Sequence, residues 1–307
     1  MTSTIPSGHQ YVLESGNQRV TVTEVGAGLR DFTVGGEAVL DGYAEQEMCD
    51  VCRGALLLPW PNRIEDGVYE FDGRRYQTPL TEPTRRNAIH GLTRWSNWSL
   101  LSSGPEHVNL ALTLHPQDGY AFSLALQVEY RLASNGLTVC TTGTNIGNGP
   151  LPYGTGHHPY LTVGGAIDRA RLKIPALMRL EADGRLIPTG RALPVAGTEY
   201  DFRELRTIGS LEMDTAFAGV LPDADGRIRS LLQSAGGVRQ LTLWMEPPYS
   251  YIMVFTGDGI PDARRRRQGI AIEPMTCAPN AYRTGHGLRV LQPGESLTTS
   301  WGIEAKL

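Results

Sequence analysis

The carboxylate of Glu273 ends a strongly apolar segment, where a charge is costly. Residues 269–274 read Gly-Ile-Ala-Ile-Glu-Pro. In an extended chain Ile270 and Ile272 share one face, so Ala271 and Glu273 share the other. A buried carboxylate costs free energy unless it is paired or held in a site. We therefore expect Glu273 either to have a structural partner or to belong to a functional site.

Two adjacent histidines, His157 and His158, follow a Gly-rich turn and precede Pro159-Tyr160. Adjacent side chains of an extended chain point to opposite faces, and Pro159 favours extended backbone at His158. The pair is therefore poorly arranged to bind one metal ion, and we predict no metal site. One imidazole can face a cleft while the other faces the core or solvent.

Polar residues also interrupt two other apolar segments. Residues 58–64 read Leu-Pro-Trp-Pro-Asn-Arg-Ile, so two prolines restrict the backbone before Asn62 and Arg63. His90 is followed by Gly91, which permits the close approach of backbone or a ligand. An Asn-Arg pair here is unusual for a core strand, so Arg63 either pairs with a structural carboxylate or serves a site.

The elements that must position these side chains are predicted to be strands. One face of residues 122–130 is apolar at every second position, and residues 20–25, 137–139 and 241–243 alternate in the same way. Asp72-Gly73 predicts a tight hairpin turn. The 36 glycines and 20 prolines punctuate the whole length. We predict an all-β fold, one large antiparallel β-sandwich domain over residues 1–307, with short helical turns within 40–50 and 204–214.

Composition excludes several classes of function. The net charge is only −4, so nothing indicates a nucleic-acid or membrane partner. We find no signal segment and no apolar stretch of about 20 residues, so we expect a cytoplasmic protein. Cys49 and Cys52 lack a second ligand pair and are interpreted as ordinary thiols. The Arg264–Arg267 run is either a solvated loop or a contact for phosphate or a partner.

Taken in order, these motifs resemble those of the aldose 1-epimerase (galactose mutarotase) family. The matching segments are Asn62-Arg63-Ile64 with the following hairpin, Ile89-His90-Gly91, His158-Pro159-Tyr160, Asp214 in Met-Asp-Thr-Ala-Phe, and Glu273-Pro274. The resemblance implies a galactose mutarotase-like β-sandwich. It implies that Glu273 is a general base and His158 a general acid, and that Arg63, His90, Asp214 and Asn62 bind the sugar. It implies no cofactor.

Anomer exchange needs an acid and a base together. Opening a cyclic aldose removes the proton of the anomeric hydroxyl and adds a proton to the ring oxygen, and doing both at once avoids charged intermediates. We expect a Glu273 carboxylate and a His158 imidazolium on opposite sides of the sugar, each favouring the charged form of the other. Trp60, Trp95 or Trp244 could offer an apolar face to the sugar.

Three alternatives remain open at this point. The His-Pro-Tyr form is similar to a bacterial branch that includes hexose-6-phosphate epimerases, for which Arg85-Arg86 or Arg264–Arg267 could bind phosphate. The scaffold could instead be a non-catalytic carbohydrate-binding module. Glu273 and Asp214 could act as the two carboxylates of a glycoside hydrolase. The sequence does not identify the monosaccharide, and the protein could be a monomer or a homodimer.

Overall fold

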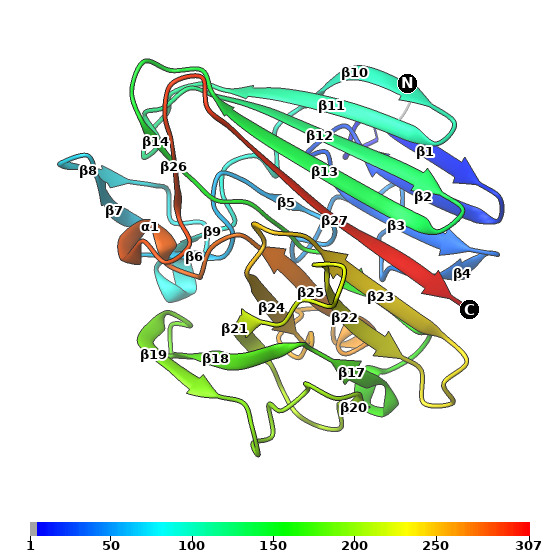
Figure 1. Ribbon diagram of the computed structural model, residues 1–307. Coiled ribbons are helices and arrows are strands. Elements are labelled where there is room, and N and C mark those ends of the chain that lie inside the picture. Colours follow the sequence, from blue (N-terminus) through cyan, green and yellow to red (C-terminus); the bar gives the residue numbers. More distant parts are fainter. Residues whose placement is uncertain (1–4) are drawn as a thin grey trace.

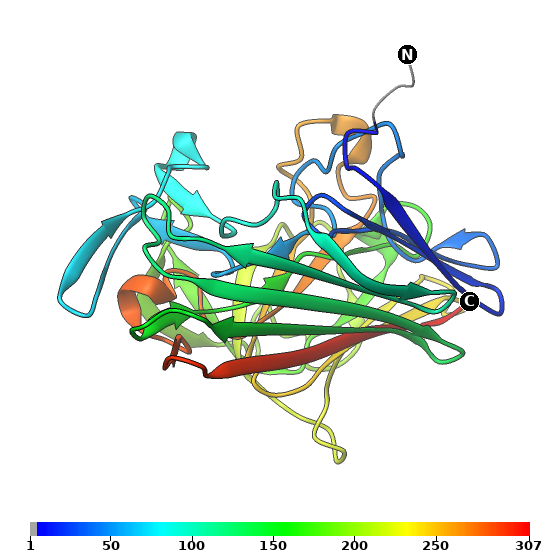
Figure 2. The same ribbon diagram turned by 90° about the horizontal axis from the view of Figure 1, so that it is seen from above.

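The computed structural model describes residues 5–307, and nearly all of its regular structure is strand. Two large antiparallel sheets face each other (Figures 1 and 2). The first has nine strands in the order β10 (Ser99–Gly104), β11 (His107–Leu114), β12 (Leu124–Ala133), β13 (Gly136–Asn145), β27 (Ser296–Lys306), β23 (Gln240–Met245), β22 (Ile228–Gln233), β17 (Arg171–Lys173) and β20 (Arg206–Thr207).

The second sheet has eight strands and carries most of the polar motifs. Its order is β19 (Pro188–Pro194), β18 (Ala176–Ala182), β21 (Asp214–Val220), β24 (Tyr251–Phe255), β25 (Ile270–Met275), β15 (Gly156–His157) and β5 (Leu56–Leu57), with β16 (Tyr160–Leu161) also paired to β25. The predicted all-β class and the large antiparallel sandwich are thus confirmed.

Smaller sheets and short helices complete the fold. A four-stranded sheet runs β1 (Gln10–Ser15), β2 (Gln18–Thr23), β3 (Leu29–Val34) and β4 (Glu37–Ala38). Three strand pairs join β6 (Arg63–Glu65) to β9 (Asn87–Ile89), β7 (Val68–Phe71) to β8 (Arg74–Gln77), and β14 (Leu151–Tyr153) to β26 (Arg289–Leu291). The helices are α1 (Ala281–Thr284) and three 3₁₀ turns, Pro83–Arg85, Ile167–Arg169 and Ala263–Arg265. None of the helices within residues 5–307 is long and apolar enough to span a bilayer.

Alternating burial explains why the two large sheets pack together. Along β12 the apolar side chains Leu124, Leu126, Val128 and Tyr130 are buried, while the intervening residues are partly or fully exposed. They join one core cluster with Ile252, Val254, Ile270 and Ile272 from the second sheet. Burying such faces against each other is the main favourable term in folding. The alternation predicted a strand beginning at Phe122, but β12 begins at Leu124. Phe122 lies just before this strand and packs edge-on against Phe71.

Strand β25 is buried on both of its faces along its whole length. All six residues are buried. Ile270 and Ile272 pack into the main core, whereas Ala271 packs with Tyr160 in a separate small cluster. The faces are therefore divided as the alternation predicts, and Glu273 lies on the face away from the main core.

Helical turns predicted within residues 40–50 and 204–214 are wrong. Neither segment contains helix, and the second contributes β20. Long-range contacts decide the first segment, because Asp41 donates its backbone N–H to Tyr160 and pairs with Arg53 and Arg265. Local propensity is a weak prior that such tertiary contacts override. The predicted Asp72-Gly73 turn is confirmed between β7 and β8, with positive φ at both residues.

Candidate active site

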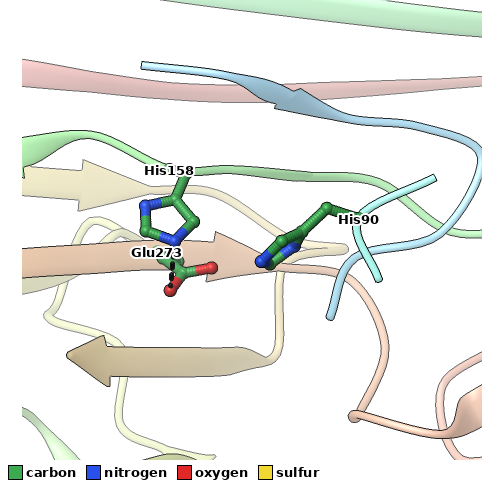
Figure 3. Close-up of side chains that lie close together, drawn as sticks. All are labelled: His90, His158 and Glu273. Atoms are coloured by element: carbon green, nitrogen blue, oxygen red, sulfur yellow. Dashed lines mark ion pairs between the residues drawn. The ribbon is translucent and has the colours of Figure 1, made fainter. Parts of the chain in front are cut away.

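His158 and Glu273 meet on the face of the second sheet that lies away from the main core (Figure 3). His158 Nε2 lies 3.3 Å from Glu273 Oε1. Both side chains are almost completely buried and line one cavity of about 230 Å³. The expectation that these groups face each other from opposite sides of a sugar is wrong, because they are in direct contact along one wall.

The neighbouring His157 points to the other face of the sheet. Its Nε2 is 3.0 Å from the Thr141 hydroxyl, and its ring packs against Trp301. Burial lowers the pKa of His157 to about 3, so this imidazole is neutral near pH 7. The alternation along the extended segment therefore separates a core histidine from a histidine of the cavity.

His90 enters the cavity from the end of β9, and its proton position is fixed. The Asn62 backbone N–H donates to His90 Nδ1 at 3.2 Å, so the neutral ring carries its proton on Nε2. Burial, and then the nearby His158, Arg94 and Arg63, lower the pKa of His90. The ring faces Glu273 (Figure 3). His90 therefore presents an N–H donor toward the carboxyl group.

Pairing of β6 with β9 brings the Asn-Arg pair beside His90, since Arg63 lies opposite Ile89. The Asn62 side chain accepts a hydrogen bond from the Arg63 backbone N–H at 2.9 Å. Arg63 itself contacts two carboxylates, Glu82 at 2.9 Å and Asp214 at 3.5 Å. Arg63 thus has structural carboxylate partners and also lines the cavity, and its role in a functional site stays a prediction.

Every residue predicted for the site lines this one cavity, and the structure adds others. The predicted set is Asn62, Arg63, His90, His158, Asp214 and Glu273; the additions include Val51, Cys52, Glu82, Arg85, Tyr160 and Phe255. The sequence analysis placed Tyr160 in a motif, whereas no sequence pattern indicated Glu82. The aromatic wall is Tyr160 and Phe255. None of Trp60, Trp95 and Trp244 lines the cavity: Trp60 and Trp244 are buried elsewhere and Trp95 is 59% exposed.

A stack of planar groups fixes the His158 ring. The Tyr160 ring is nearly parallel to it, with centroids 5.0 Å apart. The buried guanidinium of Arg53 covers the Tyr160 ring at 4.9 Å and is itself held by Asp41 and Asp50. Such stacking holds His158 with Nε2 toward Glu273.

Burial reverses the ionisation expected for the acid–base pair. It raises the pKa of Glu273 well above its usual range, with the Asp214 charge adding to the effect and Arg63 opposing it. It lowers the pKa of His158 below its usual range. A charged carboxylate and a charged imidazolium are therefore not the favoured forms of the free site. These shifts favour placing the one proton of the pair on the carboxyl group, beside a neutral imidazole.

One oxygen of Glu273 has no partner within residues 5–307. Glu273 Oε2 is buried and accepts or donates no hydrogen bond to the described protein atoms, and the same holds for His158 Nδ1. Leaving a buried polar atom unpaired costs about 1–3 kcal/mol. Such atoms in a cavity are suited to hydrogen bonding with a polar ligand.

The same three side chains also satisfy the distance requirement for a metal site. One possible ligand atom each from His90, His158 and Glu273 lies within 4.8 Å of the others. Two imidazoles and a carboxylate are a ligand set that zinc and iron accept. The absence of a bound metal ion therefore stays a prediction, which is tested by measuring activity in the presence of a chelator.

The arginines proposed for phosphate are already paired. Arg85 pairs with Glu82, and Arg86 contacts Asp66. In the Arg264–Arg267 run, three side chains pair with acidic residues and Arg266 donates to a backbone carbonyl. Only Arg85 of these arginines lines the cavity. Arg265 and Arg267 tie this loop to Asp41 and Asp168 on distant segments, so the run is not simply a solvated loop.

Comparison with known proteins identifies the family. A family model described as aldose 1-epimerase matches residues 9–304. The chain belongs to the aldose 1-epimerase family.

Some relatives of this aldose 1-epimerase family member have a named activity and others do not. The chain is 33% identical to the uncharacterized protein YihR of Escherichia coli over 94% of this chain and 91% of that protein. It is 28% identical to human galactose mutarotase over 57% of this chain and 51% of that enzyme. A galactose mutarotase-like protein of Clostridium acetobutylicum shares its fold, with a TM-score of 0.86, 20% identity, and coverage of 99% and 97% of the two chains.

Proposed function

We propose that this protein interconverts the α and β anomers of a free aldose by general acid–base ring opening and closure. One observation carries the proposal: a buried imidazole and a buried carboxyl group lie 3.3 Å apart in one cavity, with a carboxyl oxygen left unpartnered among the described residues. Family membership and the galactose mutarotase among the relatives support it.

Adjacency of the two groups suits this substrate. The anomeric oxygen and the ring oxygen of a cyclic aldose are bonded to the same carbon, so an acid and a base that are neighbours can reach both of them. Glu273 accepts the proton of the anomeric hydroxyl, and His158 donates a proton to the ring oxygen.

The proton count of the pair also fits. The free pair carries one proton, and transfer of that proton from Glu273 to His158 gives the carboxylate–imidazolium form that starts the reaction. Ring opening returns one proton to Glu273 and removes one from His158, and closure on the other aldehyde face reverses both transfers. Acid–base groups held in this way contribute about 10²–10⁴-fold to the rate.

The remaining side chains supply binding and orientation. The His90 Nε2–H and the Arg63 guanidinium donate to oxygens, while Asp214 accepts from hydroxyls. Burial raises the pKa of Asp214, which the Arg63 charge partly offsets. Tyr160 and Phe255 offer apolar surface to the C–H face of the sugar. A site that demands these hydroxyls discriminates strongly against sugars that lack them.

An unphosphorylated sugar fits the charges of the site better than a sugar phosphate. Phosphate recognition needs arginines free to donate to it. Arg63 and Arg85 both pair with Glu82, and Arg63 also contacts Asp214, so the cationic groups at the cavity are already offset. We therefore place free hexoses ahead of hexose 6-phosphates.

Anomer-exchange kinetics test the proposal. Freshly dissolved α-glucose and α-galactose should equilibrate far faster with the protein than in buffer alone, as measured by polarimetry or exchange NMR. Glu273→Gln and His158→Asn should each lower kcat by at least about 10²-fold, because each removes one proton-transfer group. Glucose 6-phosphate serves as the competing substrate.

Matched controls separate chemistry from folding. Glu246→Gln and His115→Asn make the same chemical changes outside the cavity and should retain wild-type kcat. Activity that disappears with EDTA and returns with zinc would replace the acid–base proposal with a metal site at His90, His158 and Glu273. Binding of sugar without faster exchange would favour the carbohydrate-binding module, and release of sugar from an aryl glycoside would favour the hydrolase.

A further inference from the structure

Glu82 lies at the cavity and has all of its bonding capacity used by the protein. Its two oxygens accept from Arg63 Nε at 2.9 Å and Arg63 Nη2 at 3.0 Å, a two-point pairing of fork and carboxylate. They also accept from Arg85 at 3.1 Å and from Asn87 at 2.9 Å. With four donors satisfied, Glu82 has little capacity left for a sugar hydroxyl.

That pairing determines which part of Arg63 reaches the site. The Nε edge of the guanidinium is occupied by Glu82, and Nη2 is shared between Glu82 and Asp214 at 3.5 Å. The other N–H groups of Arg63 therefore remain for the cavity, which it lines. A planar guanidinium held at two points cannot rotate, whereas one held only by Asp214 could.

The Glu82 turn is itself anchored to a distant loop of the second sheet. Asn87 is completely buried, and its amide donates both to Glu82 and to the Arg185 carbonyl at 3.0 Å. The Arg185 guanidinium donates back to the carbonyls of Arg85 and Arg86. The loop between β18 and β19 thus braces the 3₁₀ turn beside Glu82.

We propose that Glu82 is a positioning residue of the reaction, which holds the Arg63 guanidinium at two points so that its remaining N–H groups face the sugar. The kinetic part of this inference rests on the proposed function. The fixed orientation of Arg63 is a property of the ligand-free protein.

Two variants test how Glu82 holds Arg63. In the ligand-free protein the Arg63 Nε–H, which is bonded to Glu82, should give a slowly exchanging signal in ¹⁵N NMR, assigned with Arg63→Lys. Glu82→Gln has one acceptor oxygen and cannot make the two-point pairing, so it should lose this signal and lower kcat/KM about tenfold. Glu82→Asp keeps both oxygens but is one methylene shorter, so it should keep the signal while displacing the guanidinium and lowering kcat/KM about tenfold.

Controls make each outcome decisive. Glu246→Gln breaks a comparable Arg–Glu pair of 2.9 Å away from the cavity and should change neither readout. An unchanged Arg63 signal in folded Glu82→Gln would overturn the positioning role. Should Glu82→Gln not fold, an unchanged kcat/KM in Glu82→Asp would overturn the proposal. The NMR measurement needs no turnover, so inactivity of wild type would refute the proposed function separately.

Discussion

At the scale of single residues, the proton shared by His158 and Glu273 governs how activity depends on pH. With two protons the pair has no base, and with none it has no acid, so kcat/KM should be bell-shaped. Burial lowers the pKa of His158 and raises that of Glu273, so the acid limb reports His158 and the alkaline limb reports Glu273. Activity should therefore remain high at pH 7.

This order of the limbs is opposite to that of unperturbed side chains, for which carboxylate protonation at about pH 4.3 and imidazole deprotonation at about pH 6.5 would set the limits. Initial rates over a wide pH range, corrected for anomer exchange in buffer, distinguish the two. A loss of activity on the alkaline side at the ordinary imidazole pKa of about 6.5 would contradict the assignment from burial.

Local patterns together with the family resemblance could predict which residues line the cavity but not their mutual geometry. Six predicted residues line one cavity. Alternation of side chains along an extended segment is a local property, so the sequence alone could predict that His157 and His158 point to opposite faces. The pairing of Arg63 with Glu82 is set by the β6–β9 register and the turn that follows, so no local pattern could indicate it. Direct contact between His158 and Glu273 depends likewise on the packing of distant segments.

At the scale of elements, Gly91 illustrates how backbone conformation positions a functional side chain. Its φ is +68°, and a Cβ there would collide with the Leu58 backbone. The Leu92 N–H donates to the Leu58 carbonyl at 2.7 Å, which holds the chain just after His90. Any larger residue would have to push apart the segments that carry His90 and Asn62.

Gly91→Ala should therefore destabilise the protein by more than about 2 kcal/mol and reduce kcat, since positive φ and overpacking each cost about 1 kcal/mol or more. Gly73→Ala is the matched control, because Gly73 has nearly the same φ of +70° but no heavy atom within 4 Å of the position that a Cβ would occupy. Urea unfolding measures both. If both variants lose the same stability, the positive φ alone, and not the close approach to Leu58, would account for the requirement for glycine at position 91.

The same scale shows where sequence patterns fail. Strands with alternating burial, such as β12 and β23, were predictable because each buries one face. Residues 40–50 and 204–214 were predicted to contain helical turns but are held by pairings with distant strands and side chains. Short strands of two or three residues, including β5 and β15, have too few residues to show a period.

At the scale of the whole molecule, burying neutral histidines makes folding sensitive to acid. The pKa of His157 falls to about 3 on folding, from roughly 6.5 in the unfolded chain. Below about pH 6.5 the unfolded state binds a proton that the native state does not, so the free energy of unfolding decreases as pH falls toward about 3. His90 and His158 act in the same direction. Glu273 acts oppositely, since its raised pKa lets the native state bind an extra proton above about pH 4.3.

Removing one of these histidines should therefore flatten the acid dependence of stability by a calculable amount. His157 is the best choice, because it lies in the core outside the cavity. Between about pH 7.5 and 5.5, protonation of His157 in the unfolded chain lowers the free energy of unfolding of wild type by about 1.4 kcal/mol. His157→Gln should therefore lose about 1.4 kcal/mol less stability than wild type over this interval, whatever its stability at the higher pH. Urea unfolding at the two pH values gives the difference, and exposed His115→Gln should follow wild type. If wild type and His157→Gln lose equal stability, His157 must be protonated in the native state at the lower pH, and burial is not what sets its charge.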